Sequence, residues 1–190
     1  MSAGGGQSEV QWRTLGEIAT LSRGKVISKD YIQSNTGPYP VYSSQTQNNG
    51  ELGRISTYDY NGEYLTWTTD GANAGSLFYR NEKFNITNVC GLIKVSTDVI
   101  CIKFLFYYLS MVAKSYVNAG MGNPKLMSNV MAKIKIPVLE ISIQQHIVQI
   151  LDKFETICSN LSIGLPAEIE ARQKQYEYYR DKLLTFKERK

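Results

Sequence analysis

The 190-residue chain contains one histidine, His146, and only three cysteines. A single histidine and cysteines without a CxxC spacing cannot assemble an imidazole-rich or thiolate-rich metal site, so no metal is expected. A Ser-His-Asp hydrolase would have to use His146, for which the sequence provides no recognisable partners. The cysteines are Cys90, Cys101 and Cys158, and their odd number predicts buried, reduced thiols in a cytoplasmic protein.

Sequence patterns typical of several other protein classes are also missing. No stretch approaches the roughly 18 consecutive apolar residues of a membrane-spanning helix. Residues 1–10 lack the apolar segment of a secretory signal and are predicted to be a flexible leader. A Walker A motif and a glycine-rich loop following a strand are both absent, which argues against bound ATP, dinucleotide or S-adenosylmethionine. No cofactor is therefore expected, and without a long Lys/Arg run no anionic membrane is expected as a partner.

The composition is that of a folded, mildly basic chain. Apolar residues make up 43% and charged residues 20%, enough to build a hydrophobic core. The balance of 21 Lys and Arg against 17 Asp and Glu gives a net charge of +4. Such a charge is compatible with nucleic-acid binding but does not demand it.

The first part of the chain alternates short apolar or aromatic runs with polar stretches that contain turn-forming residues. Asn49-Gly50, Asn61-Gly62 and Asp70-Gly71 are predicted turns. The pattern predicts an α+β fold, with a mixed α/β domain of mostly short strands over residues 11–140. Strands are predicted at 37–42, 63–67, 76–79, 89–95 and 134–137, and helices at 102–117 and 125–131.

Residues 141–190 are predicted to be helical throughout. Gly164-Leu165-Pro166 separates two helices, because glycine is favoured after a helix end and proline at a helix start. Each helix carries an apolar stripe that needs a partner. A helical hairpin closing on its own domain and an intermolecular coiled coil both satisfy this need. The first stripe contains Ile147, Leu151, Phe154, Cys158 and Leu161, and the second Ile169, Tyr176, Tyr179, Leu183 and Phe186.

Three polar loops, 43–50, 68–76 and 118–125, are candidate binding segments. Their Asn, Gln, Ser and Thr side chains are those that pair with base edges, and their small residues allow a backbone to approach a phosphate. A carbohydrate-binding or other ligand-binding module with a dimerising stalk, using Trp67 and the tyrosines, is the closest alternative. Asn123-Pro124 resembles the start of an amino-methyltransferase motif, but the second proline and the aromatic residue are missing.

Three motifs resemble the specificity (S) subunits of type I restriction–modification systems. The first, WRTLGEIA at 12–19, is similar to the opening of the family's target-recognition domains. The second is IKIP at 134–137 followed by QQHIVQILDKF at 144–154, which is similar to the end of such a domain. The third, residues 164–186, resembles the family's conserved helical region along almost its whole length.

This resemblance implies a non-catalytic subunit that reads double-stranded DNA. In the family a recognition domain reads one part of a split DNA site, and the helical region sets the spacing to a second domain. Separate modification and restriction subunits methylate and cleave. Full-length family members carry two recognition domains and two helical regions, whereas this chain carries one of each. The resemblance therefore implies a half-length subunit with helical region 141–190, forming an antiparallel coiled coil in a homodimer.

The loops and the second helical stripe supply the candidate site residues. Arg23 and Lys29 are further basic residues that could reach phosphates. Arg172 is the one charged residue that interrupts the dimerisation stripe. Predicted base-edge and backbone contacts are Ser44, Gln45, Thr46, Asn48, Thr69, Asp70, Asn73 and Asn123, with Lys25, Arg54 and Lys125 on phosphates. Predicted dimerisation residues are Ile169, Arg172, Tyr176, Tyr179, Leu183 and Phe186.

Overall fold

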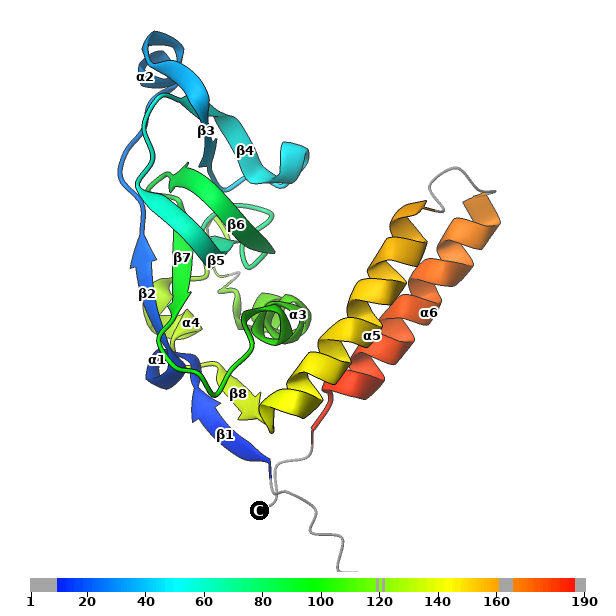
Figure 1. Cartoon of the computed structure of the whole chain (residues 1–190). Coiled ribbons are helices and arrows are strands. Elements are labelled where there is room, and N and C mark those ends of the chain that lie inside the picture. The colour runs from blue at the N-terminus through cyan, green and yellow to red at the C-terminus, as the bar shows by residue number, and fades with distance from the viewer. Residues whose placement is uncertain (1–9, 119, 121, 161–165, 187–190) are drawn as a thin grey trace, which may run out of the picture.

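A six-stranded mixed sheet forms the body of the first part of the chain (Figure 1). The computed structural model describes residues 10–118, 120, 122–160 and 166–186. All neighbouring strands are antiparallel except β3 and β6, which are parallel. In spatial order the strands are β2 (Ala19–Arg23), β7 (Cys90–Val95), β5 (Tyr60–Thr68), β6 (Leu77–Ile86), β3 (Thr36–Tyr42) and β4 (Glu51–Ile55).

The remaining elements are a second small sheet and helices of very different lengths. Strands β1 (Gln11–Thr14) and β8 (Lys135–Val138) pair with each other. None of the helices in the described part combines the length and apolar character needed to cross a membrane. The helices are α1 (Leu15–Ile18), α2 (Lys29–Ser34), η1 (Gln47–Gly50), α3 (Ile102–Val112), η2 (Ala113–Tyr116), α4 (Ser128–Met131), α5 (Ile141–Asn160) and α6 (Pro166–Leu184).

The α+β fold and the predicted elements are confirmed, with one correction. Strands β3, β5, β6, β7 and β8 cover the five predicted runs, and α3 with η2 covers the long predicted helix. The prediction of a turn at Asn61-Gly62 is wrong, because both residues lie inside β5. Pairing with β6 continues through them, opposite Lys83 and Glu82, and Gly62 accommodates a φ of 117°. Predictions for residues 1–9 and Leu161, and for the side chains of Cys158 and Ile169, lie outside the described part of the chain.

The small β1–β8 sheet joins the two ends of the first domain, residues 11–140, which the resemblance predicts to be the recognition domain. Trp12 lies opposite Pro137 and Thr14 opposite Lys135 in an antiparallel register. The motifs quoted for the start and the end of the domain are therefore direct neighbours. Helix α1 is held at the same place, because its Leu15 N–H donates to the Ile134 carbonyl at 2.8 Å. A capping box between Thr14 and Glu17 begins this helix.

One continuous core connects the sheet with both long helices. Leu65, Trp67 and Ile93 of the sheet are fully buried against α3, which lies between the sheet and α5 (Figure 1). On the other side of α3, Leu151 of α5 belongs to the same cluster. Leu184, near the end of α6, also belongs to it and is fully buried. The helical region is thus anchored in the hydrophobic core of the recognition domain.

Helices α5 and α6 form an antiparallel hairpin within one chain (Figure 1). The rings of Phe154 and Tyr179 stack with centroids 5.4 Å apart. Tyr176, Leu183 and Phe186 are partly buried against the chain's own core. Helix α5 and the base of the first domain therefore cover part of the predicted dimerisation stripe within one chain. The two helices form the hairpin, and pairing with a second copy stays a prediction.

Two polar contacts fix the hairpin relative to the recognition domain. Gln144 is fully buried, its Oε1 accepts from the Cys101 N–H at 2.8 Å, and its Nε2 donates to the carbonyls of Val99 and Leu139. About two turns further along α5, Asp152 accepts from the Tyr107 hydroxyl at 2.6 Å. Burial and these hydrogen bonds raise the pKa of Tyr107, so the phenol stays protonated and can donate.

We expect Gln144→Ala to lower the free energy of unfolding by about 1–3 kcal/mol, because it leaves three part-buried backbone groups without their partner. Gln145→Ala is the matched control, since the neighbouring Gln145 is exposed. Chemical denaturation followed by circular dichroism measures both values. Equal stability of the two variants would contradict the anchoring role of Gln144.

Candidate nucleic-acid interface

Two of the three predicted polar loops lie side by side and are joined by backbone hydrogen bonds. The Gly71 N–H donates to the Pro124 carbonyl at 2.9 Å, and the Leu126 N–H donates to the Thr69 carbonyl at 2.9 Å. Asn118 and Lys125 pair within the second loop. Residues 68–76 and 118–126 therefore form one surface, although they are far apart in the sequence.

The end of β2 and the turn between β6 and β7 adjoin the same surface. Thr69 N–H donates to the Val89 carbonyl at 3.2 Å, and Gly24 N–H donates to the Cys90 carbonyl at 3.3 Å. Lys25 forms an isolated bridge with Thr87. Four chain segments thus meet at one end of the sheet, where we define residues 23–25, 68–76, 87–89, 118, 120 and 122–126 as the loop surface.

The loop surface contains an acidic residue between two cations. An Asp70 carboxylate oxygen lies 3.6 Å from Arg23 Nη2, and the other lies 3.9 Å from Lys125 Nζ. The Asp70 side chain is only 19% exposed, whereas that of Lys125 is 54% exposed. The surface is therefore positive at its rim, and Asp70 partly neutralises the charge inside it.

The third polar loop, residues 43–50, connects to this surface through Thr87. The Thr87 hydroxyl donates to Ser43 Oγ at 3.1 Å, and the Ser43 N–H donates to the Gly50 carbonyl at 3.0 Å. Asn48 and Asn49 at the tip adopt left-handed φ values of 48° and 52°. The exposed tip projects on the side of the sheet that faces the helical hairpin (Figure 1).

The predicted contact residues differ in how accessible they are. Thr46, Asn48, Asn73 and Asn123 are exposed, and Ser44 and Gln45 are half-buried. Thr69 is fully buried, and its hydroxyl lies 2.9 Å from the Val89 carbonyl oxygen, so this side chain holds the loop rather than facing solvent.

The three predicted phosphate contacts are also in different situations. Lys125 lines an open pocket of 390 Å³ together with Asn118, Asn123 and two glycines. Arg54 forms a two-pronged ion pair with Glu51, with both N–O distances at 2.9 Å, and the hydrogen bonds to Glu51 raise its pKa. Lys25 pairs with Asp59 at 2.9 Å. Of the three predicted phosphate contacts, Lys125 is the one that lines a pocket of the loop surface together with Asn118 and Asn123.

Sequence analysis missed one residue of this region, Arg80. It is buried in β6, and its Nη2 donates to the carbonyl of Asn49 at the tip of the 43–50 loop at 2.7 Å. In the sequence it follows the aromatic run Leu77-Phe78-Tyr79, where an arginine indicates the end of a strand rather than its buried middle.

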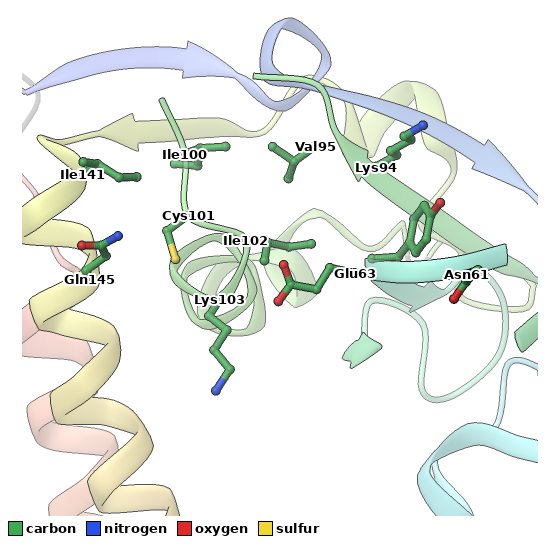
Figure 2. Close-up of a pocket in the computed structure, with 11 residues that line it drawn as sticks. Asn61, Glu63, Lys94, Val95, Ile100, Cys101, Ile102, Lys103, Ile141 and Gln145 are labelled. Atoms are coloured by element: carbon green, nitrogen blue, oxygen red, sulfur yellow. The ribbon is translucent and has the colours of Figure 1, made fainter. Parts of the chain in front are cut away.

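A second, larger pocket of 490 Å³ lies between the sheet, α3 and α5 (Figure 2). Figure 2 shows Lys103 extending away from the other polar side chains that line it. Lys103 forms an ion pair with Asp152 at 2.7 Å, and Glu63 accepts a hydrogen bond from Tyr79. Lys103 and Glu63 are thus engaged with neighbours, and Lys94 is the other charged residue of the lining. Across the described ranges, no three His, Cys, Asp or Glu side chains are placed to hold a metal ion.

The structure argues against the carbohydrate-binding alternative, because Trp67, the residue on which it mainly depended, is not accessible to a ligand. Trp67 is fully buried, and its indole N–H donates to the Leu126 carbonyl at 2.9 Å. A side chain at Gly91 would begin only 2.3 Å from the indole ring. Trp67 therefore supports the 118–126 loop from below and cannot stack on a sugar.

A mixed sheet that gathers polar loops at one end and continues into a helical hairpin defines a recognition domain attached to a helical spacer. The chain belongs to the family described as type I restriction modification DNA specificity domain, which matches residues 7–171. This assignment confirms the resemblance found in the sequence.

Specificity subunits from Mycoplasma are among the proteins similar to this chain. The type I restriction enzyme MpnII specificity subunit of Mycoplasma pneumoniae is 46% identical over 170 residues, which cover 90% of this chain and 51% of that protein. The N-terminal part of S.MpnORF289P from the same organism, which is named as a type I specificity subunit, is 48% identical, with 93% and 96% covered. The crystal structure of a type I S subunit from M. genitalium has the same fold, with a TM-score of 0.68 at 16% identity, over 95% of this chain and 47% of that one. The chain thus spans about half the length of the MpnII and M. genitalium subunits.

We expect Lys125→Ala to weaken binding to all DNA sequences and to flatten the salt dependence by about one unit of slope, because one phosphate contact is lost. Arg54→Ala should have a smaller effect, since Glu51 already engages Arg54. Fluorescence anisotropy at several salt concentrations measures both, with the exposed Lys153 of α5 changed to Ala as the control. A changed sequence preference with an unchanged slope would mean that Lys125 contacts bases.

Asp70→Asn should have the opposite effect on the salt dependence. The substitution frees Arg23 and Lys125 from their carboxylate partner, so both become available to phosphates. We expect tighter binding to unrelated DNA at low salt and a slope steeper by roughly one to two units. The same anisotropy titration, performed with DNA of random sequence, tests this. An unchanged slope would show that Asp70 does not restrain these cations.

Proposed function

We propose that this chain is the DNA-recognition subunit of a type I restriction–modification system and reads one half of a bipartite site. The observation that carries the proposal is the meeting of the 68–76 and 118–126 loops in one polar, positively rimmed surface, in a chain of the DNA specificity family. The names of the Mycoplasma pneumoniae relatives support the same role.

In the proposed complex the exposed amides and hydroxyls of the loops pair with base edges. Asn73 and Asn123 of the loop surface, and Asn48 of the 43–50 loop, can each both donate and accept, as adenine recognition in the major groove requires. Lys125 and Arg23 contact phosphates and fix the register of the protein on the duplex. Asp70 orients these two cations, and Thr69 and Trp67 hold the loops that carry the amides.

The chain does not methylate or cleave DNA itself in this proposal. It directs a modification subunit that uses S-adenosylmethionine, and a restriction subunit, to the DNA site. Residues 11–140 are the recognition domain and residues 141–190 the helical spacer. The pairing of β1 with β8 supports this division, because it places the start of the recognition domain beside the start of α5.

The activity test compares the chain alone with the chain plus its modification subunit. Incubation with labelled S-adenosylmethionine and DNA should give methyl transfer only when both proteins are present. Methylome sequencing of cells that express the pair should then give an interrupted motif. Methyl transfer by the purified chain alone would overturn the proposed division of labour.

We further propose that two copies associate through the α5–α6 hairpin. A half-length chain needs a second recognition domain to read both parts of a split site, and a two-fold dimer supplies it. Of the predicted dimerisation residues, Tyr179 remains exposed, and its neighbour Tyr178 is 60% exposed. Leu183 is half-buried in its own chain, so a charge there would damage the hairpin as well as a dimer.

Tyr178→Asp should therefore convert a dimer into a folded monomer, because a charge in an apolar interface is costly to desolvate. The monomer should bind one half-site but lose the tight binding to the two-part site that two linked domains provide. Light scattering at tens of micromolar measures the mass. Tyr31→Asp is the control, since Tyr31 is an exposed tyrosine of α2 in the recognition domain. A monomeric wild-type chain under these conditions would overturn the dimer proposal.

A further inference from the structure

Arg80 occupies an unusual place for an arginine. It lies in the middle of the sheet on β6, and only 2% of its surface is exposed. Its guanidinium carbon lies 3.4 Å from the centroid of the Tyr42 ring and 4.7 Å from that of Phe78. The cation is thus held between aromatic rings, which attract it through their quadrupoles.

No carboxylate forms an ion pair with Arg80 among the described side chains. The nearest link to an acid runs through Tyr42, whose hydroxyl donates to Glu82 Oε1 at 2.6 Å. Burial lowers the pKa of Arg80, but a guanidinium remains protonated at neutral pH. The protein therefore keeps a buried positive charge without a directly paired negative one.

Such a charge is a poor way to stabilise a core. Burying an ion carries a large desolvation cost, and an apolar side chain of similar size avoids it. Moreover, Arg80 Nη1 is buried without a hydrogen-bond partner in the described residues. The role of an arginine at this position is therefore to be sought in the hydrogen bonds that its guanidinium donates.

Those bonds lead to the tip of the 43–50 loop. Arg80 Nη2 donates to the Asn49 carbonyl at 2.7 Å, while its Nε donates to Thr66 Oγ1 at 3.2 Å and ties the guanidinium to β5. Gly50 approaches so closely that an added side chain would begin 3.2 Å from Arg80 Nη2. The buried cation therefore connects the rigid middle of the sheet to an exposed loop.

The tip needs this connection because its backbone is in an unfavourable conformation. Asn48 and Asn49 are both left-handed, which costs roughly 1 kcal/mol for each residue other than glycine. Without a bond to the Asn49 carbonyl the tip would relax, and the exposed Asn48 side chain would point elsewhere.

We propose that Arg80 is a positioning residue that fixes the tip of the 43–50 loop and thereby determines which base Asn48 reads. This inference rests on the proposed DNA-recognition function. It assigns Arg80 no contact with DNA; Arg80 acts through the backbone of Asn49.

The test uses Arg80→Met, which keeps the volume and removes the donor. The full chain, together with its modification subunit, selects binding sequences from a pool of double-stranded DNA with randomised positions. We expect base preference to be lost at a subset of positions, and affinity for the wild-type site to fall about tenfold, as for one lost base contact. Affinity for random DNA and the salt slope should not change. Amide hydrogen exchange should accelerate at residues 46–50.

Two further variants distinguish a change in base preference from a folding defect. Gly50→Ala retains the Arg80 donor, but it places a Cβ 3.2 Å from Arg80 Nη2 and from the Gln45 carbonyl oxygen at a φ of 82°, so it should displace the tip and change the preference at the same positions. Lys83→Met is the matched control, because Lys83 lies exposed on the same strand above Tyr58. It should retain the wild-type preference.

The outcomes distinguish the inference from the function on which it rests. If Arg80→Met, or Gly50→Ala should the former not fold, retains the complete wild-type preference, Arg80 does not determine base reading and the inference is wrong. Equal loss of specific and random binding together with a lower Tm would show that Arg80 is only a packing residue. A wild-type chain that selects no sequence from the pool would overturn the proposed function itself.

Discussion

Antiparallel pairing between β1 and β8 is the constraint on which the geometry of the whole chain depends. It brings Trp12 beside Pro137, so the recognition domain begins and ends at one place. Helix α5 begins three residues after β8, and Gln144 and Asp152 then bind the segment and helix that follow β7. Since these contacts all lie at the base of the domain, the direction of the helical hairpin does not depend on the loops at the other end of the sheet.

That separation allows the loop surface to differ while the anchor of the hairpin stays the same. The loop surface is built from backbone bonds, such as those of Gly71 and Leu126, which do not require particular side chains. Side chains that face solvent there, such as Asn73 and Asn123, can change without disturbing the sheet. In contrast, the side chains beneath the loops, Trp67 and Thr69, are fully buried and hold them in position.

The loop surface also combines cations with an acidic residue. A surface with only cations would bind every DNA sequence, because phosphates are identical along the duplex. Asp70 reduces the net charge beside Arg23 and Lys125 while keeping both cations in place. In the proposed function, discrimination between sequences rests on the amide side chains, whose hydrogen bonds are directional.

The sequence predicted features that depend on neighbouring residues, and it missed those that depend on the order of strands in the sheet. Alternating polarity located β3, β5 and β7, and the spacing of Ile147 and Leu151 correctly indicated a packed face on α5. Asn61-Gly62 was misassigned because the local turn signal carries no information about the β6 partner that extends the strand.

Long-range contacts also determine where the candidate site residues lie. The bond between Arg80 and Asn49 exists only because β6 lies between β5 and β3, an order that no local pattern specifies. Thr69 has the side chain of a base-contacting residue, but its burial depends on the turn at Val89. The contact residues of the loops therefore remain predictions until binding is measured.

The position of β1 has a consequence for how the chain is made. A ribosome releases Gln11–Thr14 first and Lys135–Val138 only after almost the entire recognition domain, so β1 waits for its partner strand. An unpaired strand edge attracts other extended chains, and closing so long a loop is slow. Because α5 follows β8 directly, the helical hairpin receives its anchor at the same late moment. We therefore expect nascent chains to be most prone to aggregation just before β8 emerges. They should become less prone to aggregation when the β1–β8 sheet and the helical hairpin form together.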